Sequence, residues 1–289
     1  MLDRAVMAVD LGGTTTRAAV VKGNRVTERL EMPTLAQQGP ELLLGRLVHL
    51  VGQLRQAGDT AAVGVACTGR VHGGRVSAVN LSTMPGWIGI PVEARLQQAL
   101  GRPVRVINDA RAATLAEYTA ADHPGHFMFV TVSTGIGSGL VLGGQLHEAP
   151  GGLDVGLGFT RGLNREPLEY HSSGSALGRL AVAAGQPGTA ALFDLAEAGD
   201  SRARDLLSSP LQALADRLAD AHALLGLQHL CLGGSVGLRQ HTREVVQTQL
   251  PEVSVRPARY GADAGLIGAA LYALGPSPGS TGSVKVGAP

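Results

Sequence analysis

The feature of this sequence that most constrains its fold is an alternation of short apolar runs with longer segments of helical period. In the first part of the chain the apolar runs predict strands at residues 5–9, 18–21, 61–66 and 104–107. Helical spacing predicts helices at residues 41–56 and 92–100, and a third helix that begins near Asp109. This order of elements predicts an α/β protein with largely buried sheets.

The pattern starts again at Phe127, where an apolar run, a glycine-rich turn and a second run predict a β-hairpin. A helical stripe covers residues 211–225, a strand is expected at 229–232, and the apolar segment 264–274 predicts a mostly buried helix. We therefore expect two α/β domains, residues 1–118 and 119–261, with the closing helix at 262–275 packed on the first. Residues 276–289, rich in Gly, Ser and Pro, are expected to form a flexible tail.

The composition limits the classes of partner. The 289 residues include 24 Lys and Arg against 23 Asp and Glu, so the overall charge does not favour binding to nucleic acid or to an anionic membrane. No apolar segment reaches the roughly 18 residues of a membrane span, and the start of the chain lacks the pattern of a signal peptide. We therefore expect a cytoplasmic protein. Cys67 and Cys231 each lie in an apolar run, which predicts reduced core thiols.

A strand that ends in a carboxylate and runs into glycines opens the chain as AVMAVDLGGTTTR. Gly12 and Gly13 let the backbone come close to a ligand, and the hydroxyls of Thr14–Thr16 add donors suited to phosphate oxygens. Asp10 would repel a bare phosphate, which favours a divalent cation such as Mg²⁺ between them, bound directly or through water. The alternative is a β-hairpin whose Asp and Gly serve only the geometry of the turn. This stretch alone does not decide between the two.

Two further glycine turns follow strands later in the chain. The second, STGIGSG, again places hydroxyls and glycines after an apolar run, which alone is a weak signal. The third, LGGSVG, leaves a surface free of side chains where an adenine ring or a ribose could lie. Neither turn is a P-loop or a dinucleotide-binding fingerprint. Three such turns in one chain favour a ligand-binding role more strongly than one turn does.

The stretch VINDAR is an apolar strand that ends in two polar residues before a helix. Asp109 could serve simply as the cap of that helix. A carboxylate at the start of a helix is also stabilised in its ionised form, which is what a general base requires. The two roles can coexist.

The order and spacing of these motifs resemble the sugar kinases of the ROK family, which belong to the actin and hexokinase-like superfamily. The resemblance rests on DLGGTTTR, INDARAATLAEY, VSTGIGSGLV, LGGSVGL and DAGLIGAALYAL, and it spans about residues 7–274. It implies a two-domain actin-like fold with the active site in the cleft between the domains. Within the family, the bacterial N-acetylmannosamine kinases are the most similar group, on the strength of ACTG, APGGL and GGSVGL as well.

The resemblance also implies roles for individual residues, with ATP as phosphoryl donor and a sugar as acceptor. Asp109 would take the proton from the 6-hydroxyl of the sugar, and Asp10 would organise magnesium. The residues expected to contact the nucleotide are Asp10, Gly12, Gly13, Thr14, Thr15, Thr134, Gly135, Gly137, Gly233 and Gly234. The residues expected to contact the sugar are Gly69, Asn80, Thr83, Asn108, Asp154 and Glu169.

The sequence departs from the family pattern around the sugar and at the zinc motif. No cysteine occurs in GGLDVGLGFTRGLNREPLEYHSSG, and Phe159 stands where a zinc-binding histidine is expected, so His171 alone cannot build a zinc site. Gly156 stands where the family has a sugar-binding Glu, unless Asp154 takes that part. Thr83 replaces a usual Asn, for which Asn80 could compensate. Thr15 stands where Lys is frequent.

We expect an ATP-dependent kinase that phosphorylates the 6-hydroxyl of a hexose or N-acetylhexosamine, with N-acetylmannosamine first and glucose as the alternative. A kinase-like sugar-binding protein with weak or no catalysis is a second reading, suggested by the altered sugar residues. A third is a sugar-sensing repressor, but the first strand is expected within about five residues of Met1, which argues against a preceding DNA-binding domain. The family resemblance also implies a homodimer.

Overall fold

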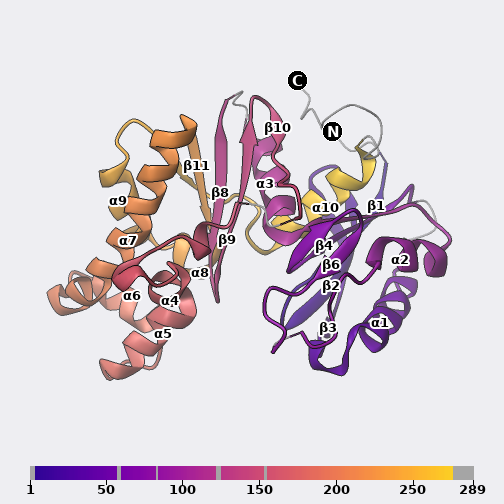
Figure 1. Cartoon of the computed structure of the whole chain (residues 1–289), viewed down its shortest axis with the longest axis horizontal. Coiled ribbons are helices and arrows are strands. Elements are labelled where there is room, and N and C mark those ends of the chain that lie inside the picture. The colour runs from indigo at the N-terminus through magenta and orange to yellow at the C-terminus, as the bar shows by residue number, and fades with distance from the viewer. Residues whose placement is uncertain (1–3, 57–59, 83, 122–124, 153–154, 276–289) are drawn as a thin grey trace. The chain divides into compact units, whose positions relative to one another are not determined.

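The computed structural model describes residues 4–56, 60–82, 84–121, 125–152 and 155–275. These residues form two compact units, each with its own sheet and hydrophobic core (Figure 1). Unit 1 contains residues 4–121, 145–152 and 262–275, and unit 2 contains residues 125–144 and 155–261. The α/β class expected from the sequence is confirmed. Thr83, Asp154 and the tail at 276–289 lie outside the described residues.

The sheet of unit 1 has the strand order β3-β2-β1-β4-β7. The first three strands form an antiparallel meander, whereas β1, β4 and β7 run parallel. Their bounds are β1 Val6–Leu11, β2 Thr15–Lys22, β3 Arg25–Pro33, β4 Val63–Cys67 and β7 Val104–Asn108. Four of these strands were predicted. The edge strand β3 was missed, because its sequence RVTERLEMP alternates half-buried with exposed positions and contains four charges.

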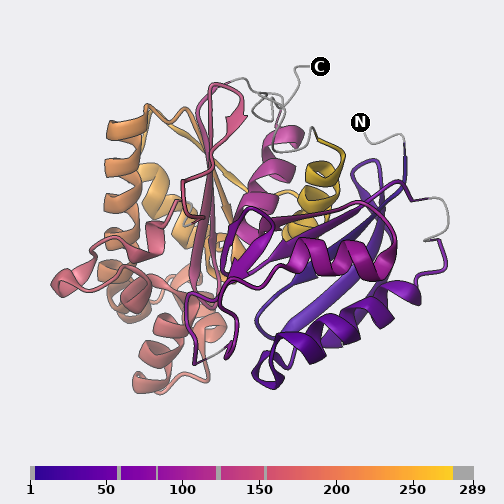
Figure 2. The same ribbon diagram turned by 45° about the vertical axis from the view of Figure 1, so that its right-hand side comes forward.

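Helices cover both faces of this sheet (Figure 2). Side chains of α1 (Pro40–Gly52) and α2 (Val92–Leu100) share one core with Val9, Leu11 and Val65. Alternate residues of the strands face α10 (Ala264–Leu274), which packs on α3 (Asp109–Ala120). The predicted helices at 92–100 and 264–274 and the start at Asp109 are confirmed, while α1 ends four residues before the predicted end. A short hairpin, β5 (Arg70–His72) and β6 (Arg75–Ser77), and the 3₁₀ turns η1 (Ala36–Gln38) and η5 (Gly261–Asp263) complete the unit.

The small residues of α10 explain how it comes so close to its neighbours. A Cβ atom on Gly268 would lie 1.7 Å from the carbonyl oxygen of Ala112 in α3. A Cβ atom on Gly64 of β4 would lie 2.0 Å from the carbonyl oxygen of Ala269. Both glycines therefore permit backbone contact that any other residue would prevent. The helix is thereby held against the sheet at the strand that lies between β1 and β7.

Unit 2 contains the predicted hairpin, β8 (Phe127–Val132) and β9 (Ile136–Leu142), within the strand order β10-β9-β8-β11-β12. The remaining strands of this sheet are β11 His229–Gly233, β12 Ser254–Pro257 and the two-residue β10 Gln145–Leu146, whose residues are counted in unit 1. Its helices are α4 Glu169–Ser172, α5 Gly174–Ala183, α6 Thr189–Glu197, α7 Ser201–Leu225, α8 Gly234–Gly237 and α9 Gln240–Gln249, with 3₁₀ turns η3 Leu157–Phe159 and η4 Leu163–Arg165. The predicted stripe at 211–225 is the second half of α7, whose N-terminus is capped by Asp200.

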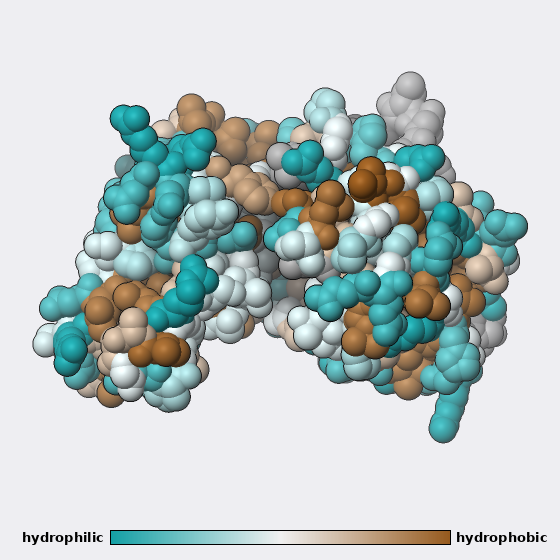
Figure 3. Space-filling model, turned by 60° about the horizontal axis from the view of Figure 1, so that its bottom comes forward, coloured by the Kyte–Doolittle hydropathy of each residue, from teal (hydrophilic) through white to brown (hydrophobic). Residues whose placement is uncertain are grey.

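Cys67 in β4 and Cys231 in β11 are both buried, as the sequence predicted. Among the described residues, no helix combines the length and the apolar character that a bilayer crossing requires. Exposed large apolar side chains, such as Ile88 in unit 1 and Val182 and Leu224 in unit 2, are scattered over both units. On the face drawn in Figure 3, apolar side chains lie in small groups among polar ones.

Candidate active site

The parallel strands of unit 1 bring the side chains of Asp10, Asn108 and Asp109 to one edge of its sheet. The register pairs Leu11 of β1 with Cys67 of β4, and Cys67 with Asn108 of β7. Asp10 precedes Leu11, and Asp109 follows Asn108. Because the carboxyl ends of neighbouring parallel strands lie at the same edge, the two carboxylates that the sequence singled out in separate motifs belong to one site.

Asn108, rather than Asp109, caps helix α3. The Oδ1 atom of Asn108 accepts a hydrogen bond from the backbone N–H of Arg111 at 3.1 Å, and its Nδ2 donates to the carbonyl oxygen of Gly69 and to Oδ1 of Asp109, each at 3.0 Å. Asp109 is the first residue of the helix, and its Oδ1 accepts from the N–H of Ala110 at 2.8 Å. The proposed capping role of Asp109 is therefore corrected. Its carboxylate is instead held in place by two donors.

The surroundings of Asp109 suit a group that takes up a proton near neutral pH. Burial, followed by the negative charge of Asp10, raises the pKa of Asp109 to about 6, although the hydrogen bonds from Ala110 and Asn108 oppose the rise. Burial and the same two carboxylates raise the pKa of the Cys67 thiol, so this cysteine stays protonated and is no nucleophile.

Asp10 faces the beginning of α10 and an arginine. Its Oδ2 lies 3.2 Å from Nη1 of Arg17, which tends to lower the pKa of Asp10, while burial has the larger effect and raises it. A Cβ atom on Gly265 would lie 3.4 Å from Cγ of Asp10, so the absence of a side chain there leaves room beside the carboxylate. Among the described residues, Oδ1 of Asp10 has no hydrogen-bond partner.

The chemistry of this donor fits magnesium carried by a nucleotide. Mg²⁺ is usually bound through one or two carboxylates together with phosphate oxygens and waters, rather than by an all-protein cage. Asp10 offers one free carboxylate oxygen, and within the part of the chain that the structure describes no group of three or more His, Cys, Asp or Glu residues could hold a metal ion.

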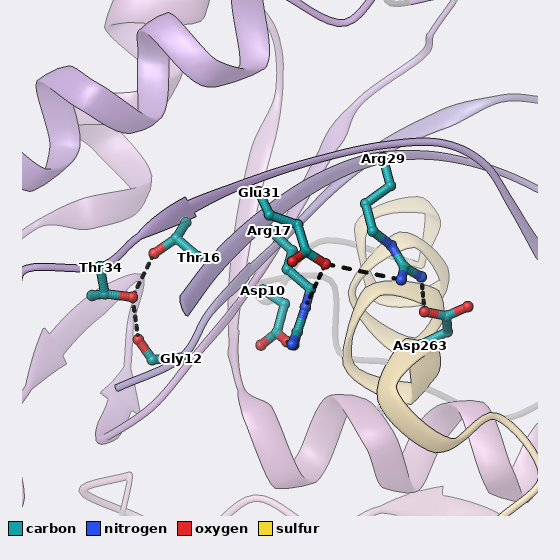
Figure 4. A network of polar contacts seen from close by, with 8 residues as sticks. All are labelled: Asp10, Gly12, Thr16, Arg17, Arg29, Glu31, Thr34 and Asp263. Carbon is teal, nitrogen blue, oxygen red and sulfur yellow. Dashed lines mark hydrogen bonds and ion pairs between the residues drawn. The ribbon is translucent and has the colours of Figure 1, made fainter. Parts of the chain in front are cut away.

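The first glycine turn, residues 12–15, is held by hydrogen bonds from Thr34, while its tip is exposed. Thr34, fully buried, donates its hydroxyl proton to the carbonyl oxygen of Gly12 at 2.8 Å and lies 2.9 Å from the hydroxyl of Thr16 (Figure 4). Its backbone N–H donates to the carbonyl oxygen of Thr14 at 2.8 Å. Gly13 and Thr14 are exposed, and no atom lies within 4 Å of a Cβ placed on Gly13. The turn thus connects the two strands of a β-hairpin, which was the alternative interpretation of this sequence. The backbone of Gly13 and Thr14 is also exposed, so a ligand can reach it.

The second glycine turn, in unit 2, is held by the start of the helical segment. Gly174 donates its N–H to the carbonyl oxygen of Ser133 at 2.6 Å. Glu169 accepts from the N–H of Ile136 through its Oε2 at 2.8 Å, and the same oxygen would lie 2.5 Å from a Cβ on Gly135. Gly135 therefore makes room for the carboxylate. Thr134 at the tip of the turn is exposed.

The glycines of the third turn are required by packing. A Cβ atom on Gly233 would lie 2.9 Å from the ring of Phe129, and one on Gly234 would lie 2.4 Å from the carbonyl oxygen of Val132. Gly234 has φ = 80°, which favours glycine. Gly137 lies in β9, paired with Thr131 of β8. These glycines let β11 and the short α8 lie directly against β8.

A model of the ROK family matches residues 6–275 of the chain. The chain belongs to the ROK family. It is 36% identical to the N-acetylmannosamine kinases of Salmonella typhi and Escherichia coli O7:K1, over 93% of this chain and 98% of each relative. The family predicted from the sequence is confirmed, and with it the enzyme class: the protein is a sugar kinase.

Solved structures of ROK proteins share the fold. The crystal structure of a ROK hexokinase from Thermus thermophilus is similar at a TM-score of 0.78 with 32% identity, covering 92% of this chain and 97% of that one. A ROK family glucokinase from Streptomyces griseus, in complex with glucose and AMPPNP, also matches at a TM-score of 0.78, with 24% identity and with 93% and 98% of the two chains covered. The predicted actin-like kinase fold is confirmed.

The residues expected to bind sugar in this ROK protein are only partly brought together. Gly69 and Asn108 are linked by a hydrogen bond at the strand edge. Asn80 is exposed, and its Oδ1 accepts from the N–H and the hydroxyl of Ser82 at 2.9 and 2.7 Å. Glu169 belongs to unit 2, where it contacts the second glycine turn. Thr83 and Asp154 lie outside the described residues.

The segment in which the sequence departs from the expected zinc motif contains Phe159 and His171. Phe159 is 46% exposed at the end of η3, and Gly156 precedes this turn. Nε2 of His171 lies 2.9 Å from a carboxylate oxygen of Glu166. This histidine is therefore paired with an acidic side chain.

Two residues of the site were missed by the sequence reasoning, Arg17 and Thr34. The motif drew attention to the three threonines after the glycines, but the contact of Arg17 with Asp10 depends on the cross-strand register. Strand alternation offered a signal, since Arg17 stands two residues after Thr15 and therefore shares its face of β2. Thr34 lies beyond the missed strand β3, so nothing local indicated that it returns to the turn.

Proposed function

We propose that this protein is an ATP-dependent kinase that transfers the γ-phosphoryl group of ATP to the 6-hydroxyl of N-acetylmannosamine. The observation that carries the proposal is Asp109, held by two donors beside Asp10, with a pKa of about 6. A carboxylate of this kind is ionised at neutral pH and basic enough to take a hydroxyl proton. The choice of sugar is supported by 36% identity to N-acetylmannosamine kinases over nearly the whole length of both chains.

In the proposed reaction Asp109 accepts the proton of the 6-hydroxyl while that oxygen forms a bond to the γ-phosphorus. The bond between the γ-phosphorus and the bridging oxygen breaks, and ADP leaves with its electrons. Asn108 fixes the orientation of Asp109 through its Nδ2 and anchors the beginning of α3 through its Oδ1. Positioning and charge stabilisation account for most of the rate in such transfers.

We assign phosphate binding to the turn at residues 12–15 in unit 1 and to Thr134, Gly135 and Gly137 in unit 2. Gly13, Thr14 and Thr134 are exposed, and backbone N–H groups and hydroxyls at such turns suit phosphate oxygens. Gly233 and Gly234 are assigned to the adenosine on the family resemblance of the LGGSVGL motif. Asp10 is assigned to magnesium, which when bound offsets the negative charge of the phosphates, directly or through water.

A hexose kinase with glucose as substrate is the alternative. It is supported by the 32% identity to the Thermus thermophilus ROK hexokinase and by the changed sugar residues, Gly156 and Thr83. Each hydrogen bond lost to a sugar hydroxyl costs roughly 1 kcal/mol or more, enough to alter which sugar is preferred. A kinase-like binding protein with weak catalysis is less well supported, because both Asp10 and Asp109 are present. We further propose a cytoplasmic homodimer that takes only small-molecule partners.

The test is ADP release from Mg-ATP, measured with a panel that includes N-acetylmannosamine, N-acetylglucosamine, glucose and mannose. The proposal expects N-acetylmannosamine to give the highest kcat/KM, and Asp109→Asn to reduce kcat by at least about a thousandfold. Asp205→Asn, a change to an exposed carboxylate on α7, is the matched control and should leave the rate unchanged. Background rates with every sugar would refute the kinase, and a preference for glucose would favour the alternative.

A further inference from the structure

The first glycine turn contains no positive charge of its own. Residues 12–15 offer backbone N–H groups and hydroxyls, and the next cation along the chain is Arg17. Residues 15 and 17 of β2 lie on the same face of the strand, because side chains alternate. The register pairs Arg17 directly with Asp10 of β1 and with Glu31 of β3. A guanidinium therefore stands two residues beyond the turn, on the face that carries Asp10.

Figure 4 shows a row of alternating charges that runs across the three strands. Arg17 contacts Asp10 through Nη1 at 3.2 Å and Glu31 through Nε at 3.1 Å. Glu31 lies 4.0 Å from Arg29, and Arg29 pairs with Asp263 at the start of α10. Each acidic partner of Arg17 is thus placed by the sheet, and the Nε contact holds the side chain from the outer strand.

The guanidinium of Arg17 has donors left for a ligand. It carries five N–H groups, and in the described part of the chain two of them are used, one for Asp10 and one for Glu31. Its side chain is 27% exposed, whereas that of Asp10 is 16% exposed. Arginine binds phosphate well, because its planar fork matches two phosphate oxygens.

We propose that Arg17 is a nucleotide-binding residue whose guanidinium turns from Asp10 to the terminal phosphates of the bound nucleotide, while Glu31 keeps hold of its Nε. The inference rests on the proposed function, in which Asp10 faces the cation that accompanies those phosphates. In the protein without nucleotide, Arg17 then remains paired with Asp10 and compensates the negative charge of that carboxylate. Arg17 thereby supplies the positive charge that the turn lacks.

The test measures binding without turnover. Isothermal titration with AMP-PNP, with inorganic tripolyphosphate and with adenosine, each in the presence of Mg²⁺, compares the wild type with Arg17→Met. Binding of AMP-PNP and of tripolyphosphate should weaken at least tenfold, with adenosine unchanged. Arg29→Met, which alters the same row of charges at a distance from Asp10, is the matched control and should change each affinity less than twofold.

A second variant distinguishes phosphate binding from a purely structural role. In Thr15→Lys combined with Arg17→Met, the new lysine lies on the same face of β2, so part of the affinity for AMP-PNP should return. Unchanged AMP-PNP binding in Arg17→Met, or an equal loss of adenosine binding, would overturn the inference. The proposed function has its own readout: a wild type that binds tripolyphosphate through Arg17 but phosphorylates no sugar would refute the kinase and leave this inference standing.

Discussion

At the scale of single residues, Asp109 carries the chemistry, and its pKa leads to a prediction about the pH dependence of the rate. The base must be ionised to accept a proton, so kcat/KM should fall about tenfold per pH unit as the pH drops below about 6. The fall in rate begins at a higher pH than for an ordinary aspartate, because burial and the charge of Asp10 raise the pKa of Asp109. Initial rates with the preferred sugar, measured between about pH 5 and 8 with ATP and Mg²⁺ saturating, check it. A rate that stays flat down to about pH 5 would show that Asp109 is not the base.

The same raised pKa has a consequence for stability. The folded protein binds the Asp109 proton more tightly than the unfolded chain, whose pKa is near 3.8, so this group's contribution to stability is lost as the pH rises from about 4 to 6. Asp109→Asn should therefore be more stable than the wild type at about pH 8, by about 1–3 kcal/mol, with the gain vanishing near pH 3.5. Urea unfolding of both proteins at the two pH values measures this. An equal or lower stability of the variant at the higher pH would contradict the account.

At the scale of elements, the accuracy of the sequence predictions follows from how local each signal is. The bounds of α2 and α10 were predicted to the residue, since a breaker or a change of pattern lies at their ends. The edge strand β3 was missed because exposed charges interrupt its apolar positions. Within the site, Asp10 and Asp109 carry their signals in their own motifs. The partners Arg17 and Thr34 depend on register and on the return of a later strand, which no single motif encodes.

The packing of α10 on α3 gives a prediction at this scale. Gly268→Ala would place a methyl group 1.7 Å from the backbone oxygen of Ala112, which cannot be relieved by a change of rotamer, so the helices must separate. We expect the free energy of unfolding to fall by at least about 2 kcal/mol. Gly45→Ala in α1 is the control, because no atom lies within 4 Å of that position and a helical alanine should gain about 0.5–1 kcal/mol. Similar losses in both variants, measured by urea unfolding, would show that the close approach is unimportant.

At the scale of the whole molecule, the described residues form two hydrophobic cores that have no residue in common. Leu47 is fully buried in the core of unit 1, and Leu214 is fully buried in the core of unit 2. Each unit contains segments that are distant in sequence: unit 1 includes the helix α10, and the sheet of unit 2 includes β11 and β12, which follow α7. We therefore expect a change in one core to act first on the unit that contains it.

This division predicts separate responses in calorimetry. Leu47→Ala and Leu214→Ala each remove about the same buried volume. Each should lower the free energy of unfolding of the unit that contains it by about 2–5 kcal/mol. In the absence of ligands we expect two unfolding transitions, of which Leu47→Ala lowers one and Leu214→Ala lowers the other, each by about 5–15 °C. A single transition that both variants lower equally would mean that the units unfold together. In that case the stability of the first glycine turn, in unit 1, would depend on unit 2 even without a nucleotide.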